Sequence, residues 1–230
     1  MGNMKDQSDK DRRLAHIGRL SAGIGHNIMT PLSLIMMNSD LLSMKLKGKD
    51  ELLSHLKEIT QQATKISRIA ETMMWKVKTE EQDTPSTIQV GLLVQENIEF
   101  WMGDMFFKHR MEKDIQINTQ TPLLKGVPYH FTSFIDEWIL LTLERARPLN
   151  GGKFILKVDS PETNHFFISF KDSLPPLSKA QFNALANGCI HPSCAEYFPA
   201  LHRLLTYHPA DLKLSTSNDG SMTLRLTWEI

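Results

Sequence analysis

The chain has 230 residues, enough for one large domain or two small ones. Hydrophobic residues make up 41% and charged residues 23%, which is the composition of a folded protein and argues against disorder. Lys+Arg and Asp+Glu are equal at 26 each, so the formal net charge of +0 gives no reason to expect nucleic acid or another polyanion as a partner.

No apolar run approaches the roughly 18 to 20 residues that a membrane-spanning helix needs. The start of the chain, residues 1–10, is a polar tail and lacks the apolar core of a signal peptide. We therefore expect a cytoplasmic protein without a membrane partner.

Residues 11–80 contain one proline and no strand-like alternation, so they predict a helical hairpin. The first helix should run from about residue 11 to residue 44. Gly48 follows a basic helix end and suits a C-cap, and Asp50 can cap the second helix, which should run to about Lys78.

The second predicted helix carries an apolar seam whose members are alternately four and three residues apart: Leu52, Leu56, Ile59, Ala63, Ile66, Ala70, Met73 and Val77. The first helix has a less regular seam of the same kind: Ile17, Ser21, Ile24, Ile28, Pro31, Ile35 and Leu42. Two helices joined by a short turn cannot bury both seams, whereas a dimeric four-helix bundle would. We therefore expect residues 11–80 to form a parallel homodimer.

Residues 81–87 are polar, contain Pro85 and are predicted to be a linker. The remainder, residues 88–230, has mixed character. Its expected helices span residues 88–111, 129–146 and 197–207, and its expected strands span residues 115–118, 153–159, 165–171, 212–217 and 221–230. The last two strands should form a hairpin around residues 218–220. This order predicts an α+β sandwich with helices on one face of a mixed sheet.

The two cysteines, Cys189 and Cys194, do not suggest a disulfide framework. With His191 they form the pattern C-x-H-x-x-C, which would supply part of a metal site. No fourth ligand is evident, so we expect no metal here.

The most informative segment is residues 19–32, which read Arg-Leu-Ser-Ala-Gly-Ile-Gly-His-Asn-Ile-Met-Thr-Pro-Leu. It resembles the H-box of sensor histidine kinases, in which a small-residue stretch precedes a histidine, an acidic residue, a hydrophobic residue, Thr or Asn, Pro and Leu. The resemblance implies that His26 is a phosphoacceptor. If Ile24 and Ile28 occupy the inward heptad positions, His26 takes the outermost position, where a neutral imidazole can act as a nucleophile.

One departure from the H-box follows the histidine directly. The resemblance implies an acidic residue that acts as a base during autophosphorylation, and this chain has Asn27 instead. An amide cannot take up a proton at neutral pH, although it can orient the ring by a hydrogen bond. Thr30 matches a position that helps a water attack a partner's phosphoaspartate in some family members. A hydrogen bond from Thr30 back to its own helix is an equally good interpretation.

The C-terminal part resembles the ATPase domain of the same kinases, which is shared with gyrase and MutL. Residues 144–153 are similar to the end of the N-box helix and the following turn, residues 166–172 to the strand entering the G1 box, and residues 212–230 to the final hairpin. The resemblance implies an ATPase-like frame for residues 88–230.

The resemblance does not extend to the residues that hold ATP. Trp138 and Thr142 stand where the N-box has two asparagines, and Leu174 and Pro176 replace glycines of the G1 box. Asp172 keeps the carboxylate that accepts a bond from adenine, but a structural role in a turn is the more economical interpretation. The segment expected to form the lid, residues 193–199, contains no glycine. Because phosphates need converging backbone N–H groups, we expect no ATP cofactor.

Three functions remain under consideration. The first is a histidine phosphotransferase that exchanges a phosphoryl group between His26 and the aspartates of response-regulator receiver domains, with Mg²⁺ supplied by the receiver. The second is a non-catalytic dimeric scaffold that binds response regulators or kinases. The third is an active sensor histidine kinase with a divergent ATP site. The intact motif around His26 favours the first, and the lost ATP boxes disfavour the third.

Overall fold

A computed structural model of the chain describes residues 28–46, 49–162, 164–189, 192–217 and 221–229. The chain divides into two compact units, Met1–Lys78 and Thr79–Ile230. Within the described ranges, no helix combines the length and the apolar character that crossing a membrane requires.

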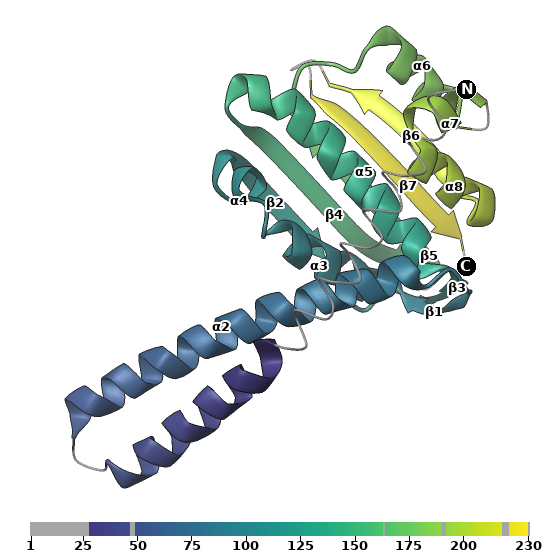
Figure 1. The fold of residues 1–230 in the computed structure, drawn as a ribbon. Coiled ribbons are helices and arrows are strands. Elements are labelled where there is room, and N and C mark those ends of the chain that lie inside the picture. The colour runs from purple at the N-terminus through teal and green to yellow at the C-terminus, as the bar shows by residue number, and fades with distance from the viewer. Residues whose placement is uncertain (1–27, 47–48, 163, 190–191, 218–220, 230) are drawn as a thin grey trace, which may run out of the picture. The chain divides into compact units, whose positions relative to one another are not determined.

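The described part of the first unit is a pair of helices that lie side by side (Figure 1). The first helix spans residues 28–45, and α2 spans Asp50–Glu81. Asp50 and Glu51 lie in the first turn of α2 and Lys78 in its last, where their charges favour the helix dipole. For the described residues, the predicted helical hairpin is confirmed.

Only half of the predicted apolar seam is buried within the chain. Leu56, Ala63 and Ala70, which are seven residues apart along α2, are buried. The alternate seam residues of the hairpin remain about half exposed, and they are Leu52, Ile59 and Ile66 on α2 and Ile28, Ile35 and Leu42 on the first helix. Each described helix therefore leaves one apolar line exposed along its length.

The second unit contains a mixed five-stranded sheet in the order β2-β4-β5-β7-β6. Its strands are β2 (Met111–Ile117), β4 (Gly152–Glu162), β5 (His165–Asp172), β6 (Asp211–Thr216) and β7 (Met222–Glu229). The β2–β4 pair is parallel, and the other three pairs are antiparallel. A separate antiparallel pair is formed by β1 (Ser86–Gln89) and β3 (Leu123–Gly126).

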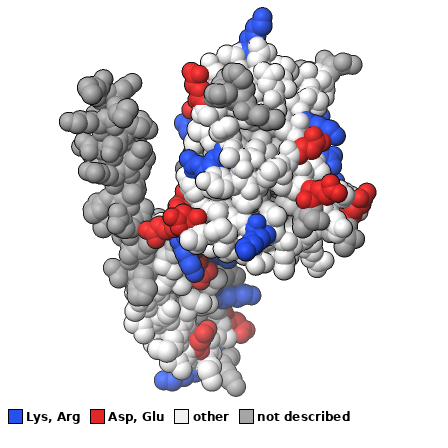
Figure 2. All heavy atoms as spheres, turned by 90° about the vertical axis from the view of Figure 1, so that its right-hand side faces the viewer, with Lys and Arg blue, Asp and Glu red and all other residues white. Residues whose placement is uncertain are grey.

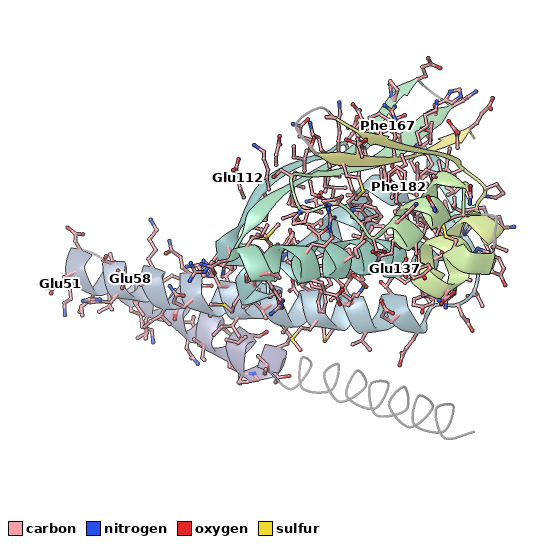
Figure 3. All side chains as sticks on the ribbon, turned by 90° about the horizontal axis from the view of Figure 1, so that it is seen from above. Glu51, Glu58, Glu112, Glu137, Phe167 and Phe182 are labelled. Carbon is pink, nitrogen blue, oxygen red and sulfur yellow. A yellow bond between two sulfur atoms is a disulfide. The ribbon has the colours of Figure 1, made fainter. Side chains whose placement is uncertain are left out.

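The helices of the second unit gather on one face of this sheet (Figure 1). They are α3 (Val90–Trp101), α4 (Met105–Arg110), α5 (Pro128–Ala146), α6 (Lys179–Ala186), α7 (Pro192–Tyr197) and α8 (Pro199–Tyr207), and a short 3-10 helix, η1 (Arg147–Leu149), follows α5. Figure 3 shows Glu137 on the helical side of the sheet and Phe167 on the opposite side. This arrangement confirms the predicted α+β order with helices on one face.

The core lies between the sheet and α5, and it is rich in aromatic residues. Along β7 every second residue is buried, as expected for a strand with one covered face. β5 follows the same alternation from Phe166 to Asp172, except that Phe167 is buried as well. The largest fully buried side chains are Trp138, Phe107, Phe131, Phe134, Phe154, Phe166, Phe170 and Phe198. Such a core gives the second unit a packed interior of its own.

Several element boundaries differ from the prediction. The expected helix over residues 88–111 is broken, because Asp104 accepts a hydrogen bond from Phe107 N (2.7 Å) and so starts a new helix, α4. Residues 81–87, expected to be a linker, contain the end of α2 and the start of β1. Helix α6 was not predicted, although Ser178 and Gln181 form a capping box at its start.

The terminal hairpin was predicted as a pair of strands. β6 and β7 are antiparallel, and Ser217 N donates to Ser221 O (2.8 Å) where the strands meet. The expected turn, residues 218–220, lies outside the described residues.

Candidate functional site

The predicted phosphoacceptor and its neighbour, His26 and Asn27, lie outside the described residues. Thr30 is the third described residue of the first helix, and its side chain is exposed. Pro31 is also exposed and lies within the same helix. The geometry available for the predicted site residues therefore concerns Thr30 and the ATPase-like positions of the second unit.

Helix α5 places the two N-box positions, Trp138 and Thr142, one turn apart on its buried face. The helix forms here because Pro128 occupies its first turn and apolar residues recur at helical spacing through the segment. Thr142 Oγ1 donates to Trp138 O (2.8 Å), so its hydroxyl proton is used within the helix.

The indole of Trp138 fills the space that these positions face. Its ring centroid lies 5.7 Å from that of Phe170 on β5 and 6.4 Å from that of Phe198, just before α8. All three side chains are buried. Aromatic rings at these distances make close nonpolar contacts, so this part of the structure is a packed core rather than a ligand cavity.

The G1-box carboxylate, Asp172, is bound by a side chain that the sequence did not suggest. Arg145, from the last turn of α5, donates from Nη1 to Asp172 Oδ2 (2.8 Å) and from Nη2 to Asp172 Oδ1 (2.9 Å). Asp172 Oδ1 also accepts from Leu174 N (3.1 Å), and only 2% of the residue is exposed. Both carboxylate oxygens are thus held inside the protein by charge-assisted hydrogen bonds.

The residues that replace the G1 glycines complete this packing. Leu174 is buried and lies so close to Gly152 that a Cβ at Gly152 would be 2.4 Å from Leu174 Cδ2. Arg145 Nε donates to Pro175 O (2.8 Å), which fixes the turn after β5. Pro176 is exposed at the next position. The turn is therefore held by contacts with α5 and with the start of β4.

The segment expected to be the lid contains α7 and leads directly into α8. Phe182 packs partly buried against the core, whereas Tyr197 is 38% exposed. Cys189 and Cys194 form a disulfide, contrary to the prediction, because a left-handed turn at Cys189 brings their Cα atoms to 5.0 Å. Their sulfurs are then not thiolate ligands, and the described residues contain no metal-type cluster of three His, Cys, Asp or Glu.

A second set of residues, not found from the sequence, joins α8 to α5. Glu137 Oε1 accepts from Ala200 N and Glu137 Oε2 accepts from Leu201 N, each at 3.0 Å. Burial raises the pKa of the Glu137 carboxyl above its usual value. Arg203 Nη1, in the middle of α8, donates to the hydroxyl of Tyr129 (2.7 Å).

Two histidines lie at the other end of this contact. The ring of His130 lies 5.6 Å from that of His208, and burial lowers the pKa of each below its usual value. The positive charge of Arg203 lowers the pKa of His130 further, and that of His130 does the same for His208. No sequence pattern marks these histidines, because His130 lies in α5 and His208 follows the end of α8, and only the fold brings them together.

At the positions that the resemblance assigns to nucleotide, the structure thus places an indole, an engaged threonine, an ion-paired carboxylate and a buried leucine. On the face of the molecule drawn in Figure 2, Lys and Arg side chains lie among Asp and Glu side chains, and neither sign forms a continuous patch. The arrangement offers a packed scaffold, and the reactive group predicted from the sequence lies elsewhere, at His26.

No protein-family model matches the sequence, and no curated protein matches it. Among solved structures, the Acinetobacter baumannii histidine kinase AdeS is similar at 8% identity, with a TM-score of 0.47, over 89% of this chain and 95% of that one. A blue-light activated histidine kinase domain from Erythrobacter litoralis is similar at 11% identity and a TM-score of 0.47, over 85% of this chain and 95% of that one. The mycobacterial sensor histidine kinase MprB is similar at 9% identity and a TM-score of 0.47, over 63% and 97%. These similarities are in backbone fold alone.

Proposed function

We propose that this chain is a histidine phosphotransferase of two-component signalling, which exchanges a phosphoryl group between His26 and the aspartates of receiver domains. The observation that carries the proposal is the segment ending in His26-Asn27-Ile28-Met29-Thr30-Pro31-Leu32, which resembles the phosphoacceptor motif of sensor histidine kinases. The chain makes the exchange without an ATP-dependent kinase activity of its own.

The transfer needs little from the histidine side. The lone pair of a neutral imidazole nitrogen forms the N–P bond as the P–O bond to the aspartate breaks, and the aspartate leaves as a carboxylate. Mg²⁺ on the receiver neutralises the phosphoryl oxygens. His26 needs exposure and aim, which the outer heptad position and the small neighbours Ala22, Gly23 and Gly25 would supply. Asn27 orients the ring by a hydrogen bond and does not act as a base.

The packing of the second unit supports the absence of a kinase reaction. The rings of Trp138, Phe170 and Phe198 occupy the space beside the N-box positions. The guanidinium of Arg145 engages both oxygens of Asp172, the carboxylate that would otherwise accept a bond from adenine. Binding ATP in the usual way would require displacing rings from the core and breaking a buried ion pair, both of which are costly.

We further propose that the first unit forms the parallel homodimer of a four-helix bundle. Ile35 from the first helix and Ile59 and Ile66 from α2 line one groove of the hairpin, with Leu32 and Ala63 also lining it. The remaining lining residues of this groove are polar or charged: His55, Glu58, Gln61 and Gln62. A second groove of the hairpin is lined by polar and charged residues alone, among them Asp40, Lys57 and Lys65. In a two-fold symmetric dimer the same apolar residues of both copies meet each other. The second copy would therefore cover the first groove and leave the second groove in contact with water.

The exchange is tested with receivers from the same cell that have been phosphorylated on aspartate. The unaltered chain should take up acid-labile phosphate, and His26→Gln should reduce this uptake to background because glutamine offers no nucleophilic nitrogen. His16→Gln, in the same predicted helix, and His109→Gln, on the exposed end of α4, should retain full uptake.

Two outcomes would contradict the proposal. Equal labelling of the His26→Gln variant and the parent would place the acceptor elsewhere. Binding of receivers without exchange, for every receiver of the cell, would make the chain a dimeric scaffold. Retention of the dimer by the His26→Gln variant, measured by light scattering, ensures that lost labelling is not lost assembly.

A further inference from the structure

Helix α8 is held against α5 through ionisable groups at both of its ends. At its start, Glu137 on α5 accepts hydrogen bonds from Ala200 N and Leu201 N (3.0 Å each). These are amides of the first turn, which have no partner within the helix, and the carboxylate charge also favours the positive end of the helix dipole. The start of α8 is therefore anchored by a fixed acceptor.

At the end of α8 the contact with α5 is made by aromatic rings, two of which belong to histidines. His130, in the first turn of α5, lies 4.7 Å from the ring of Tyr207 and 5.6 Å from that of His208. His130 is only 7% exposed, and its Nδ1 is buried without a hydrogen-bond partner among the described residues. A proton added to the His130 ring would create a buried positive charge, and neither of the rings in contact with it carries a negative charge to neutralise it.

His208 is fixed from three directions, and its position requires the neutral ring. Its Nε2 accepts from Val127 N (3.4 Å), and its carbonyl accepts from Trp228 Nε1 (3.1 Å) on β7. The chain passes close to the ring at Gly126, where a Cβ would be 2.7 Å from His208 Cε1. Protonation of Nε2 would turn the acceptor into a donor that faces the Val127 N–H, and the hydrogen bond would be lost.

The charges around the two histidines do not compensate such a proton. From α8, the guanidinium of Arg203 lies beside the Tyr129 hydroxyl and is itself positive. From α5, the hydroxyl of Tyr129 accepts the hydrogen bond from Arg203, and Glu137 lies against the start of α8, at its far end from the two histidines. The contact from β7 is the uncharged indole of Trp228. Each histidine also repels the other once it is charged.

We propose that the end of α8, from Arg203 to His208, separates from α5 when His130 and His208 take up protons on mild acidification. Glu137 keeps the start of α8 attached, so the opening is local and exposes the aromatic ring of Phe131, against which the ring of His208 packs. The α5–α8 contact would then act as a pH-sensitive regulatory element in a signalling protein.

The pKa shifts of the two histidines determine whether acidification strengthens or weakens the α5–α8 contact. Burial lowers the pKa of both histidines in the attached state, whereas after release they return toward about 6.5. The stabilisation of the attached state is therefore fully present above about pH 6.5 and is lost as the pH falls below it. Glu137 acts in the opposite sense at lower pH, because burial raises its pKa and proton uptake there favours attachment. The histidine response should thus be cleanest between pH 7.5 and 5.5.

The test is amide hydrogen exchange of the full chain at pH 7.5, 6.5 and 5.5, with exchange times scaled for the intrinsic pH dependence. The equilibrium constant for opening of residues 203–208 should increase between pH 7.5 and 5.5 by up to about tenfold for each histidine. This factor follows from proton linkage, because each histidine has a pKa of about 6.5 once it is released. Residues 166–170 of β5 should remain protected throughout, which distinguishes local opening from acid unfolding.

Three variants test whether His130 and His208 cause the pH-dependent opening. His130→Phe keeps the ring contacts, and His208→Gln keeps an acceptor for Val127 N. Neither new side chain can take up the proton, so in each variant the increase in opening should be about tenfold smaller than in the parent. His109→Phe, on the exposed end of α4, should respond as the parent does. Equal scaled exchange of residues 203–208 at pH 7.5 and 5.5, or a full response in both His130→Phe and His208→Gln, would overturn the proposal.

Discussion

Replacing Arg145 by methionine should lower the free energy of unfolding of the second unit by about 3–5 kcal/mol, because it leaves the Asp172 charge buried without a partner. Asp172 is 2% exposed, and after the change the backbone N–H of Leu174 is the hydrogen-bond donor that remains to it among the described residues. Methionine keeps much of the volume of the arginine stem, so the effect isolates the lost charge and hydrogen bonds.

The change should be visible as a fall of about 10 °C in the melting temperature, given the size of the second unit. Lys171→Met is the matched control, since it removes a positive charge from the residue next to Asp172 on the partly exposed side of β5. The free energy of unfolding of the Lys171→Met variant should stay within about 0.5 kcal/mol of that of the parent.

The double variant Arg145→Met, Asp172→Leu should recover most of the loss, because an apolar pair of similar volume often replaces a buried ion pair without penalty. A single Arg145→Met variant as stable as the parent would mean that Asp172 is not confined by this pair. The carboxylate would then have to be considered again as a group free to meet adenine.

Ile66→Glu should convert the proposed homodimer into a monomer. Ile66 is 44% exposed within the chain and lines the first groove with Ile35 and Ile59, so the single hairpin accepts glutamate there. In a symmetric dimer the same change would bury two carboxylates without partners, one from each copy, and each carries a large desolvation penalty. Light scattering should report a change from twice 26.3 kDa to 26.3 kDa.

Two further variants separate assembly from folding. Thr64→Glu places the same carboxylate in the second groove, which polar and charged residues line, and it should leave the dimer intact. Leu56→Glu enters a position that is 8% exposed within the chain and should unfold the hairpin, with loss of helical circular dichroism. A parent chain that is monomeric at micromolar concentration would contradict the dimer.

The periodic parts of the fold were predictable from the sequence because their burial repeats along one element. The seam of α2 and the alternation of β5 and β7 are of this kind. β1 and β3 were missed because each has only four residues, too few for a period to be recognised. The break before α4 was missed although Gly103 and Asp104 together are a turn and capping signal.

The candidate site shows the same division. Trp138, Thr142, Asp172 and Leu174 were found because they align with motif positions in the chain. Arg145 was named only as part of an N-box helix, since its pairing with Asp172 joins residues on different elements. Glu137 and the two histidines were missed for the same reason: their partners are supplied by α8, and no local pattern records that contact.

The most direct test of the proposed function compares two phosphoryl donors on the unaltered chain. It measures phosphate on histidine after incubation with about 1 mM labelled ATP and Mg²⁺, a concentration at which even a site worth only about 4 kcal/mol would be half filled. In a parallel sample the same label is supplied on a receiver aspartate. We predict no label from ATP and label at His26 from the receiver. Label from ATP alone that is lost in the His26→Gln variant would contradict the account and make the chain an active kinase.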